Sequence, residues 1–377
     1  MKDFLGIYIH IPFCIKKCPY CDFTSFEYMG REEEEKYVNY LIKEVELKRD
    51  NSFIVDTIYF GGGTPSLLFS DSLERILNTI FKNFSVADNP EISIEVNPGT
   101  VTEDKLKSWK SFGINRISLG VQSFLEKELK ILGRIYSPEE IYKTYSLIRK
   151  FGFDNVNFDI IYSIPFQEFE DFKFSLRKAI DLSPEHISLY NLVIEENTPF
   201  YERWRKGELS LIDDEKEAEM FSFAMEFLST NNFIQYEISN FSKDRKYFCK
   251  HNLKYWKQDP YLGFGVSAYS LILPFRYGNY KDLFVYYEKI DKKELPIEER
   301  EYLEKDNLIK DAIFVGLRLT EGINLESFKR KYGEDLRKFM PNYEFFIRKG
   351  FLEEKEGKVY LTREGILLAN EILEDLF

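Results

Sequence analysis

An apolar run followed by three cysteines opens the chain: Gly6-Ile7-Tyr8-Ile9-His10-Ile11-Pro12-Phe13-Cys14-Ile15-Lys16-Lys17-Cys18-Pro19-Tyr20-Cys21. The apolar part predicts a β-strand that ends at Pro12, because proline interrupts strand pairing. The cysteines, spaced Cys-x3-Cys-x2-Cys, are therefore expected on a loop just beyond a strand end. Thiolates are the usual ligands of a 4Fe–4S cluster, so three of them can hold three of its corners. The fourth iron then stays open to a substrate or cofactor.

A structural zinc site is the alternative interpretation of these residues. Zinc binds four ligands, and His10 together with the three cysteines would make a Cys3His set. His10 is expected on the strand, however, where alternate side chains point to opposite faces. Structural zinc sites also commonly use two separated ligand pairs, and a second pair is missing from the sequence. The pattern therefore favours an iron–sulfur cluster.

The composition indicates a globular protein with a sizeable core. The chain has 377 residues, of which 44% are hydrophobic and 31% charged, enough for one large domain or two ordinary ones. With 52 Lys and Arg against 64 Asp and Glu, the net charge of −12 argues against a nucleic-acid partner bound mainly by charge. Four cysteines are too few for a disulfide scaffold. The sequence has neither a signal-like start nor an apolar run of about 18 residues. We therefore expect a cytoplasmic protein with no membrane span. This expectation leaves peripheral association with a membrane open.

Strands and helices are expected to alternate after the cysteine loop. Amphipathic helix patterns occupy residues 32–49, 71–84, 103–112, 138–151 and 168–182, and apolar strands occupy 55–60, 91–96, 115–119, 155–162 and 186–192. This alternation predicts an α/β fold with a parallel sheet, either doubly wound or a partial barrel. Ligands of such sheets bind at the carboxyl ends of the strands. The polar and glycine-rich residues expected there are Cys14 to Cys21, Gly61 to Ser66, Glu95, Gln122, Asp159 and Tyr190.

Two of these segments together resemble the radical S-adenosylmethionine enzymes: Cys14-x3-Cys18-Pro19-Tyr20-Cys21 and Gly61-Gly62-Gly63-Thr64-Pro65. Further segments make the chain, from about residue 6 to its end, similar to the oxygen-independent coproporphyrinogen III oxidase family. The resemblance implies a partial parallel (β/α) barrel followed by a small, mainly helical, winged-helix-like C-terminal domain. The further segments are Tyr8 to Cys14, Ser118 to Phe124, Leu132-Gly133-Arg134, Phe158 to Tyr162 and Tyr236 to Asn240.

That family contains a porphyrinogen dehydrogenase and a branch of heme chaperones. Phe23 stands where the dehydrogenase has a fourth cysteine, and His251-Asn252-x-x-Tyr255-Trp256 resembles the motif linked to heme in the chaperones. The resemblance therefore implies a chaperone that delivers heme to an apoprotein and takes electrons from a donor. The alternatives are an oxygen-independent coproporphyrinogen III oxidase and, disfavoured by the acidic charge, a radical enzyme acting on RNA. The chain departs from the family pattern at Tyr136, Phe166 and Tyr269.

The resemblance also implies roles for single residues. Cys14, Cys18 and Cys21 would hold the cluster, and His251 would contact heme, with Cys249 as another candidate ligand. Residue chemistry alone leaves other roles open: strand-end carboxylates also cap helices, and an arginine also serves as a surface charge. A histidine can likewise lie on a partly exposed loop above a packed tryptophan. The residues implied to contact S-adenosylmethionine are Tyr8, Tyr20, Gly62, Gly63, Thr64, Glu95, Gln122, Arg134 and Asp159.

We expect a barrel over residues 1–240, a connecting region over 241–305 and a C-terminal domain over 306–377. In the connecting region, the Gly-x-Gly of residues 263–265 predicts a plain loop, and the charge-dense residues 292–305 predict a solvated connector or a helix start. Helices at 311–319, 324–332 and 343–349, a hairpin over 351–361 and a last helix from 363 to about 376 resemble a winged helix. We interpret this part as a packing or lid domain rather than a DNA-binding one.

Overall fold

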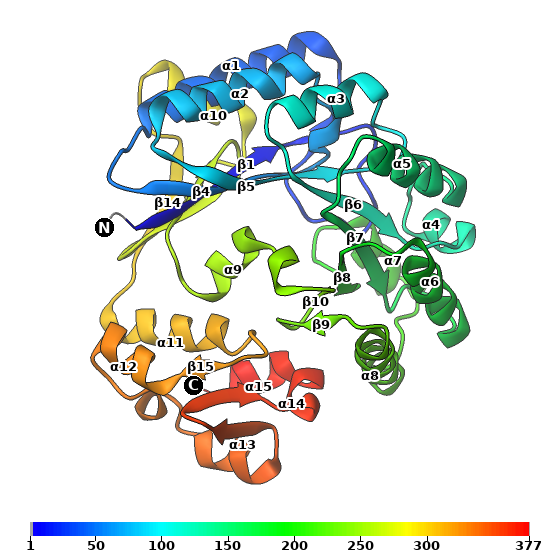
Figure 1. The fold of residues 1–377 in the computed structure, drawn as a ribbon, viewed down its shortest axis with the longest axis vertical. Coiled ribbons are helices and arrows are strands. Elements are labelled where there is room, and N and C mark those ends of the chain that lie inside the picture. The colour runs from blue at the N-terminus through cyan, green and yellow to red at the C-terminus, as the bar shows by residue number, and fades with distance from the viewer. Residues whose placement is uncertain (1–2, 377) are drawn as a thin grey trace.

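The computed structural model describes residues 3–376, and its main body is one open, curved sheet of 12 strands covered by helices (Figure 1). The sheet's centre is parallel, in the order β11 (Tyr261–Phe264), β1 (Phe4–Ile11), β4 (Ile54–Gly62), β5 (Val86–Val96), β6 (Arg116–Gln122), β7 (Val156–Tyr162) and β8 (His186–Asn191). Antiparallel strands extend it at both sides. Beyond β11 lie β12 (Tyr269–Ile272), β13 (Phe275–Asn279) and β14 (Ile297–Tyr302), and beyond β8 lie β10 (Asn240–Ser242) and β9 (Ile234–Gln235).

Helices shield the convex side of this sheet (Figure 1). Their apolar faces pack on strands that read as nearly continuous apolar runs, and every residue of β6 is buried. Strands buried on both faces are what a parallel sheet with outer helices requires. These helices are α1 (Arg31–Leu47), α2 (Ser70–Asn83), α3 (Glu103–Ser111), α4 (Glu126–Ile131), α5 (Pro138–Lys150), α6 (Phe169–Leu182), α8 (Asp214–Thr230) and α10 (Leu283–Asp291).

The predicted α/β fold with an open, partial barrel is confirmed, and the six predicted strands follow one another in the expected order. Two expectations were wrong. Residues 261–264 are not a loop but β11, which pairs in parallel with β1. Residues 297–302 are not a connector or a helix but β14, an exposed edge strand paired with β13. The sequence did not reveal either strand, because neither shows the local pattern that predicts one. Each forms a strand by pairing with a segment that is distant along the chain.

The C-terminal part has its own hydrophobic core and is mainly helical, as expected. The expectation of one continuous last helix was wrong, because the backbone leaves the helical conformation at Leu368 (φ −113°, ψ 24°) and splits it in two. A three-stranded sheet completes this part. Its elements are α11 (Lys305–Gly316), β15 (Ile323–Asn324), α12 (Leu325–Tyr332), a 3-10 turn (Leu336–Phe339), α13 (Tyr343–Lys349), β16 (Leu352–Lys355), β17 (Lys358–Leu361), α14 (Arg363–Leu367) and α15 (Ala369–Asp375).

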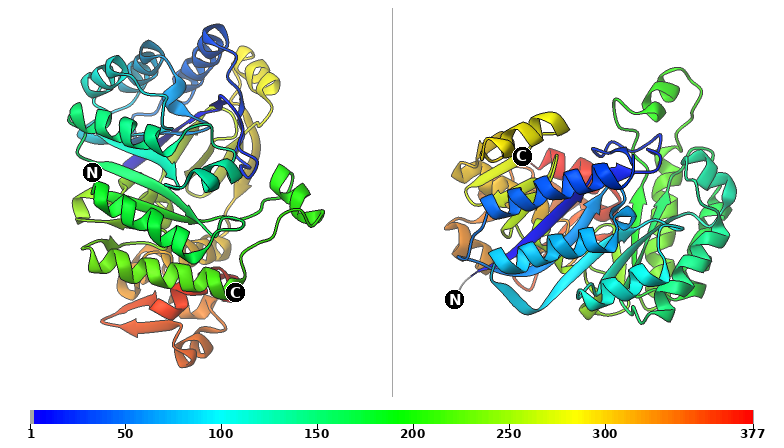
Figure 2. Two further views of the ribbon diagram at one scale, coloured as in Figure 1. Left: turned by 90° about the vertical axis from the view of Figure 1, so that its right-hand side faces the viewer. Right: turned by 90° about the horizontal axis from the view of Figure 1, so that it is seen from above.

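Three segments stand apart from the sheet and its covering helices. The cysteine loop runs between the short strands β2 (Phe13–Cys14) and β3 (Phe26–Glu27), next to a protruding arm that carries α7 (Pro199–Arg205) (Figure 2). The backbone N–H of Phe200 on this arm donates to the Pro19 carbonyl at 2.9 Å. The helix α9 (Lys250–Trp256) lies in the opening of the curved sheet, above the C-terminal part (Figure 1). Among the helices of residues 3–376, none combines the length and apolar character needed to cross a membrane.

Candidate functional site

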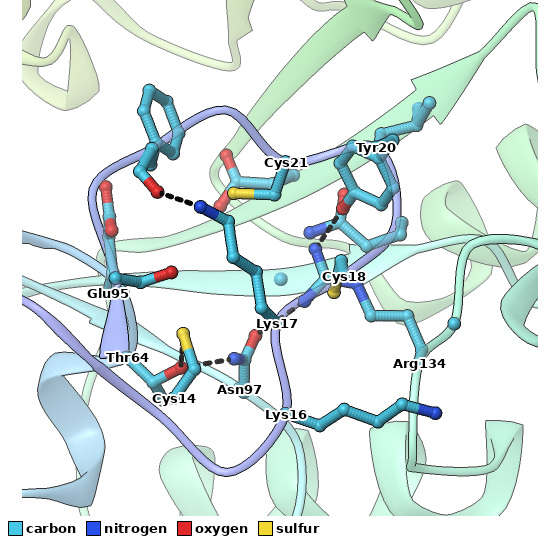
Figure 3. Close-up of a pocket in the computed structure, with 18 of the residues that line it drawn as sticks. Cys14, Lys16, Lys17, Cys18, Tyr20, Cys21, Thr64, Glu95, Asn97 and Arg134 are labelled. Atoms are coloured by element: carbon cyan, nitrogen blue, oxygen red, sulfur yellow. Dashed lines mark hydrogen bonds between the residues drawn. The ribbon is translucent and has the colours of Figure 1, made fainter. Parts of the chain in front are cut away.

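A cavity of about 690 Å³ opens at the carboxyl ends of the parallel strands, where the sequence predicts the site (Figure 3). Polar side chains and backbone from the strand ends meet the cysteine loop in it. Tyr8 and His251, also predicted as cofactor contacts, do not line it. The predicted residues that do are Cys14, Cys18, Cys21, Tyr20, Gly62, Gly63, Thr64, Glu95, Gln122, Arg134 and Asp159.

The three cysteines are half-buried around the loop, and the Thr64 hydroxyl donates to Cys14 Sγ at 3.7 Å (Figure 3). Burial raises the pKa of Cys14, and raises that of Cys21 to about 11, so loading of a metal group must release protons. Within residues 3–376, no three His, Cys, Asp or Glu residues lie close enough together to hold a metal ion. A four-iron cluster is larger than an ion and takes one thiolate at each of three separate corners, so the three thiols suit a cluster.

His10 is engaged elsewhere than at the cysteines. Its Nε2 donates to the Thr24 carbonyl at 2.8 Å, so Nδ1 must accept the hydrogen bond from the Tyr8 hydroxyl at 3.1 Å. Burial lowers the pKa of this imidazole to about 4, which keeps it neutral. With both ring nitrogens occupied, His10 is not available to complete a Cys3His zinc site.

The glycine turn after β4 brings backbone close to the cysteine loop. Gly62 has φ +114°, and a Cβ there would lie 2.7 Å from the His10 ring. A Cβ on Gly63 would lie 2.7 Å from the Phe13 carbonyl. Only glycine fits at either position, and the turn therefore presents bare backbone to the cavity.

Two half-buried carboxylates face the cavity from β5 and β7, the strands on either side of β6. Glu95 accepts from the Gly62 N–H and the Tyr59 hydroxyl, each at 3.1 Å, while Asp159 accepts from Ser118 at 2.9 Å and from Asn157 at 2.8 Å. Burial, and then the Asp159 charge, raise the pKa of Glu95 to about 8; burial raises the pKa of Asp159 as well. Among the helices of the described residues, neither carboxylate serves as an N-cap, and both line the cavity.

Arg134 joins the cavity wall to the glycine turn through a residue that sequence reasoning missed. Its Nη1 donates to Asn97 Oδ1 at 3.2 Å, and Asn97 Nδ2 donates to Thr64 Oγ1 at 2.9 Å (Figure 3). Nη2 donates to the Tyr20 hydroxyl. Among the described residues, Arg134 Nε is enclosed and has no hydrogen-bond partner, while the residue itself lines the cavity, where a guanidinium suits a carboxylate-bearing ligand. Asn97-Pro98-Gly99 signalled the strand end in the sequence, but not this bridging role.

Gln122 and Tyr136 complete the wall beside Asp159. Gln122 is buried with φ +62°, a left-handed conformation that is uncommon outside glycine and often marks a functional position. The Tyr136 hydroxyl donates to the Gly120 carbonyl at 2.6 Å, which fixes a side chain at which the sequence departs from the family pattern. This departure from the family pattern therefore lies at the cavity itself.

The mouth of the cavity exposes apolar side chains. Ile15, Phe23, Ile135 and Val193 come from three separate loops, and each is between 51% and 62% exposed. The exposed Lys16 and Lys17 lie in the same rim, together with the carboxylates of Asp22, Glu140 and Glu195. An exposed apolar rim around a cavity is typical of a surface that binds a partner or ligand.

His251 lies outside this cavity and is 1% exposed. Its Nδ1 is hydrogen-bonded to Thr57 Oγ1 and its Nε2 to the Tyr255 hydroxyl, each at 2.9 Å. Burial lowers the pKa of His251 to about 3, so the ring is neutral. Tyr8 lies half-buried beside it, with 6.4 Å between the two ring centroids. The sequence could indicate the residue types of this cluster but not its enclosure.

Comparison with known proteins shows which families this chain is similar to. Residues 8–179 match the radical SAM superfamily and residues 303–368 the HemN C-terminal domain. The heme chaperone HemW of Bacillus subtilis (strain 168) is 34% identical over 97% of both chains, and that of Escherichia coli (strain K12) is 39% identical over 71% of this chain and 70% of its own. The solved coproporphyrinogen III oxidase HemN of Escherichia coli shares the fold, with a TM-score of 0.86 at 22% identity, over 100% of this chain and 90% of HemN.

Proposed function

The chain belongs to the radical S-adenosylmethionine superfamily and, within it, to the family of the HemW heme chaperones, and from this premise we propose that it is a heme chaperone. It would hold a 4Fe–4S cluster and S-adenosylmethionine, bind heme and deliver the heme to an apoprotein. The observation that carries the proposal is the convergence of the three loop cysteines, Arg134 and Glu95 on one cavity.

The residues of the cavity divide by the chemistry that they offer. The three loop cysteines would hold the cluster, which when bound supplies one-electron chemistry and an open iron. Arg134 would pair with the carboxylate of S-adenosylmethionine through its open Nε. Glu95 and Asp159 would accept from its hydroxyl or amino groups. Its remaining proposed contacts are Tyr8, Tyr20, Gly62, Gly63, Thr64 and Gln122.

The apolar mouth of the cavity supports the proposal that the ligand set includes a flat apolar macrocycle. Ile15, Phe23, Ile135 and Val193 offer apolar contact, and Lys16 with Lys17 matches the acid groups of heme. His251 stays a proposed heme contact, one that requires its Nε2 to give up the Tyr255 hydroxyl. Cys249 is fully buried, with Sγ 3.8 Å from Glu91 Oε1, and would also have to be released.

The proposal implies two protein partners and a division of labour along the chain. A heme-accepting apoprotein receives the cargo, and a one-electron donor reduces the cluster. We propose that residues 1–240 form the cofactor-binding part, 241–305 the connecting part and 306–377 the packing or lid domain. The separate hydrophobic core of the C-terminal residues supports the last boundary.

The experiment that tests the proposal starts with anaerobic reconstitution using iron and sulfide. We expect a 4Fe–4S absorption spectrum, a saturable heme spectrum on titration, and transfer of that heme to a heme-free globin. The same protein is then incubated with S-adenosylmethionine, a reductant and coproporphyrinogen III. Conversion to protoporphyrinogen without heme transfer would contradict the chaperone and favour the oxidase, whereas bound zinc without iron and sulfide would contradict both.

A further inference from the structure

His251 is packed against the wall of the cavity from behind. Its ring stacks on Tyr59 with 5.2 Å between centroids and 26° between planes. The Tyr59 hydroxyl donates to Glu95 Oε1 at 3.1 Å, and both Tyr59 and Glu95 line the cavity. We propose that His251 is a positioning residue for S-adenosylmethionine, acting through Tyr59 on Glu95. This inference rests on the proposed function, because that function supplies the ligand.

The His251 ring is held on both edges as well as on its face. Thr57 and Tyr255 occupy its two nitrogens, and Thr57 lies on β4 two residues before Tyr59. Residues two apart on a strand point to the same face, so β4 presents one hydrogen bond and one stacking surface to the same ring. Any rotation of the ring breaks both hydrogen bonds and the stack. Such a fixed ring fixes the Tyr59 hydroxyl in turn.

The helix that carries His251 is fastened to the strand that carries Glu95. Glu91 accepts from the backbone N–H groups of Lys250 and His251, each at 3.1 Å, at the first turn of α9. A carboxylate at a helix N-terminus satisfies open N–H donors and meets the favourable end of the helix dipole. Glu91 and Glu95 lie four residues apart on the same face of β5, so one strand both anchors α9 and presents a carboxylate to the cavity.

A second hydrogen-bonded chain reaches α9 from the other cavity carboxylate. Asn157 Nδ2 donates to Asp159 at 2.8 Å, and Asn157 Oδ1 accepts from His186 Nδ1 at 2.6 Å. His186 Nε2 must then accept from the Tyr236 hydroxyl, at 2.8 Å. That hydroxyl accepts from the Cys249 N–H at 3.1 Å, at the N-cap of α9. Both carboxylates are thus connected to α9, Glu95 through the Tyr59 hydroxyl and its stack on His251, and Asp159 through a chain of hydrogen bonds.

Affinity for S-adenosylmethionine, measured by calorimetry on the reconstituted protein, tests this inference in a set of matched variants. Tyr59→Phe keeps the stack and removes only the hydroxyl bond to Glu95, so we expect binding weaker on the order of fivefold. His251→Ala removes the stack and both hydrogen bonds and should weaken binding at least as much. His251→Phe keeps a ring against Tyr59 and should retain more affinity than His251→Ala. Tyr145→Phe, which removes a hydroxyl bond to the Leu182 carbonyl away from the cavity, should bind as the wild type does.

Heme titration of the same variants separates positioning from iron ligation, because phenylalanine cannot ligate iron. Unchanged affinity for S-adenosylmethionine in both His251 variants, with heme binding lost in both, would overturn the inference. If the His251 variants do not fold, Tyr59→Phe decides, and wild-type affinity in it would also overturn the inference. A wild-type protein that binds neither cluster nor S-adenosylmethionine contradicts the proposed function itself, and this inference with it.

Discussion

The cavity wall and the interior behind it contain the same kinds of polar side chain, but Arg134 on the wall and the two histidines behind it complete their hydrogen bonds differently. On the wall, buried Arg134 Nε has no hydrogen-bond partner among the described residues. Burial raises the pKa of Glu95 to about 8, which favours the uncharged form of its side chain. Behind the wall, His251 and His186 use both ring nitrogens. An unpaired buried polar group costs free energy until a ligand binds to it, so such a group favours ligand binding. A polar group whose hydrogen bonds are all made within the protein stabilises the local structure instead. The comparison predicts that substitutions on the cavity wall weaken ligand binding, whereas substitutions behind the wall lower the free energy of unfolding.

The largest expected effect is on the cysteine loop. Replacing Cys14, Cys18 or Cys21 by alanine removes one corner ligand and should abolish the 4Fe–4S cluster. Iron and sulfide content after anaerobic reconstitution measures this. Cys249→Ala is the matched control, because Cys249 is buried away from the loop and should keep full iron and sulfide content. A normal cluster in any of the three loop variants would contradict the assignment.

The interior region is tested by a partly buried ion pair, in which 26% of the aspartate side chain is exposed. Lys254 Nζ lies 2.7 Å from Asp56 Oδ1, with only 6% of the lysine side chain exposed. Lys254→Met leaves the carboxylate of Asp56 unpaired and should lower the free energy of unfolding by about 2 kcal/mol or more, read from thermal melting.

The control for that change is Lys43→Met, which breaks an exposed pair with Asp291 at 3.2 Å. Exposed pairs contribute less than about 1 kcal/mol, so its melting curve should barely move. Equal destabilisation by the two variants would remove the distinction between the interior and the surface.

On the cavity wall, Arg134→Ala should weaken the binding of S-adenosylmethionine without loss of the cluster. Hydrogen bonds between charged groups contribute about 1.5–3 kcal/mol, which corresponds to roughly ten- to hundredfold in the dissociation constant. Arg363→Ala, on the surface of the C-terminal part, is the control and should bind as the wild type does. Calorimetry measures both, and a wild-type dissociation constant for Arg134→Ala would show that the open Nε does not meet this ligand.

The last expected effect is a pH dependence set by Glu95. Burial, and then Asp159, raise the pKa of Glu95 to about 8, so the carboxyl is mostly protonated at pH 7 in the free protein. A cationic ligand favours the carboxylate, and its binding must therefore release that proton. Affinity for S-adenosylmethionine should rise by up to about tenfold per pH unit between pH 6 and 8 and level off above.

Glu95→Gln cannot lose a proton, so its binding should show a flatter pH profile over the same range. Any slope that remains belongs to Asp159, whose pKa burial also raises. An equally steep profile in Glu95→Gln and the wild type would exclude Glu95 as the titrating group.

Local patterns were sufficient for six of the seven parallel strands of the sheet and for the cysteine loop. Apolar runs, amphipathic helices and glycine turns are encoded within a few residues, so their order and their place at strand ends could be read directly. The same signals could not find β11 or β14, because these strands exist through pairing with β1 and β13 across the fold. Nor could they find Asn97, whose role depends on Thr64, just after β4, and on Arg134, between α4 and α5.

The sequence by itself determined the family, the α/β architecture and the edge of the sheet at which the cavity lies. These features follow from spacing along the chain, which is fixed by covalent connection. Only the tertiary structure decided that Arg134 lines the cavity with one donor unpaired while both ring nitrogens of His251 are paired behind it. Whether a polar group is open or satisfied depends on what the rest of the fold brings within hydrogen-bond distance, and no local pattern specifies those distant partners.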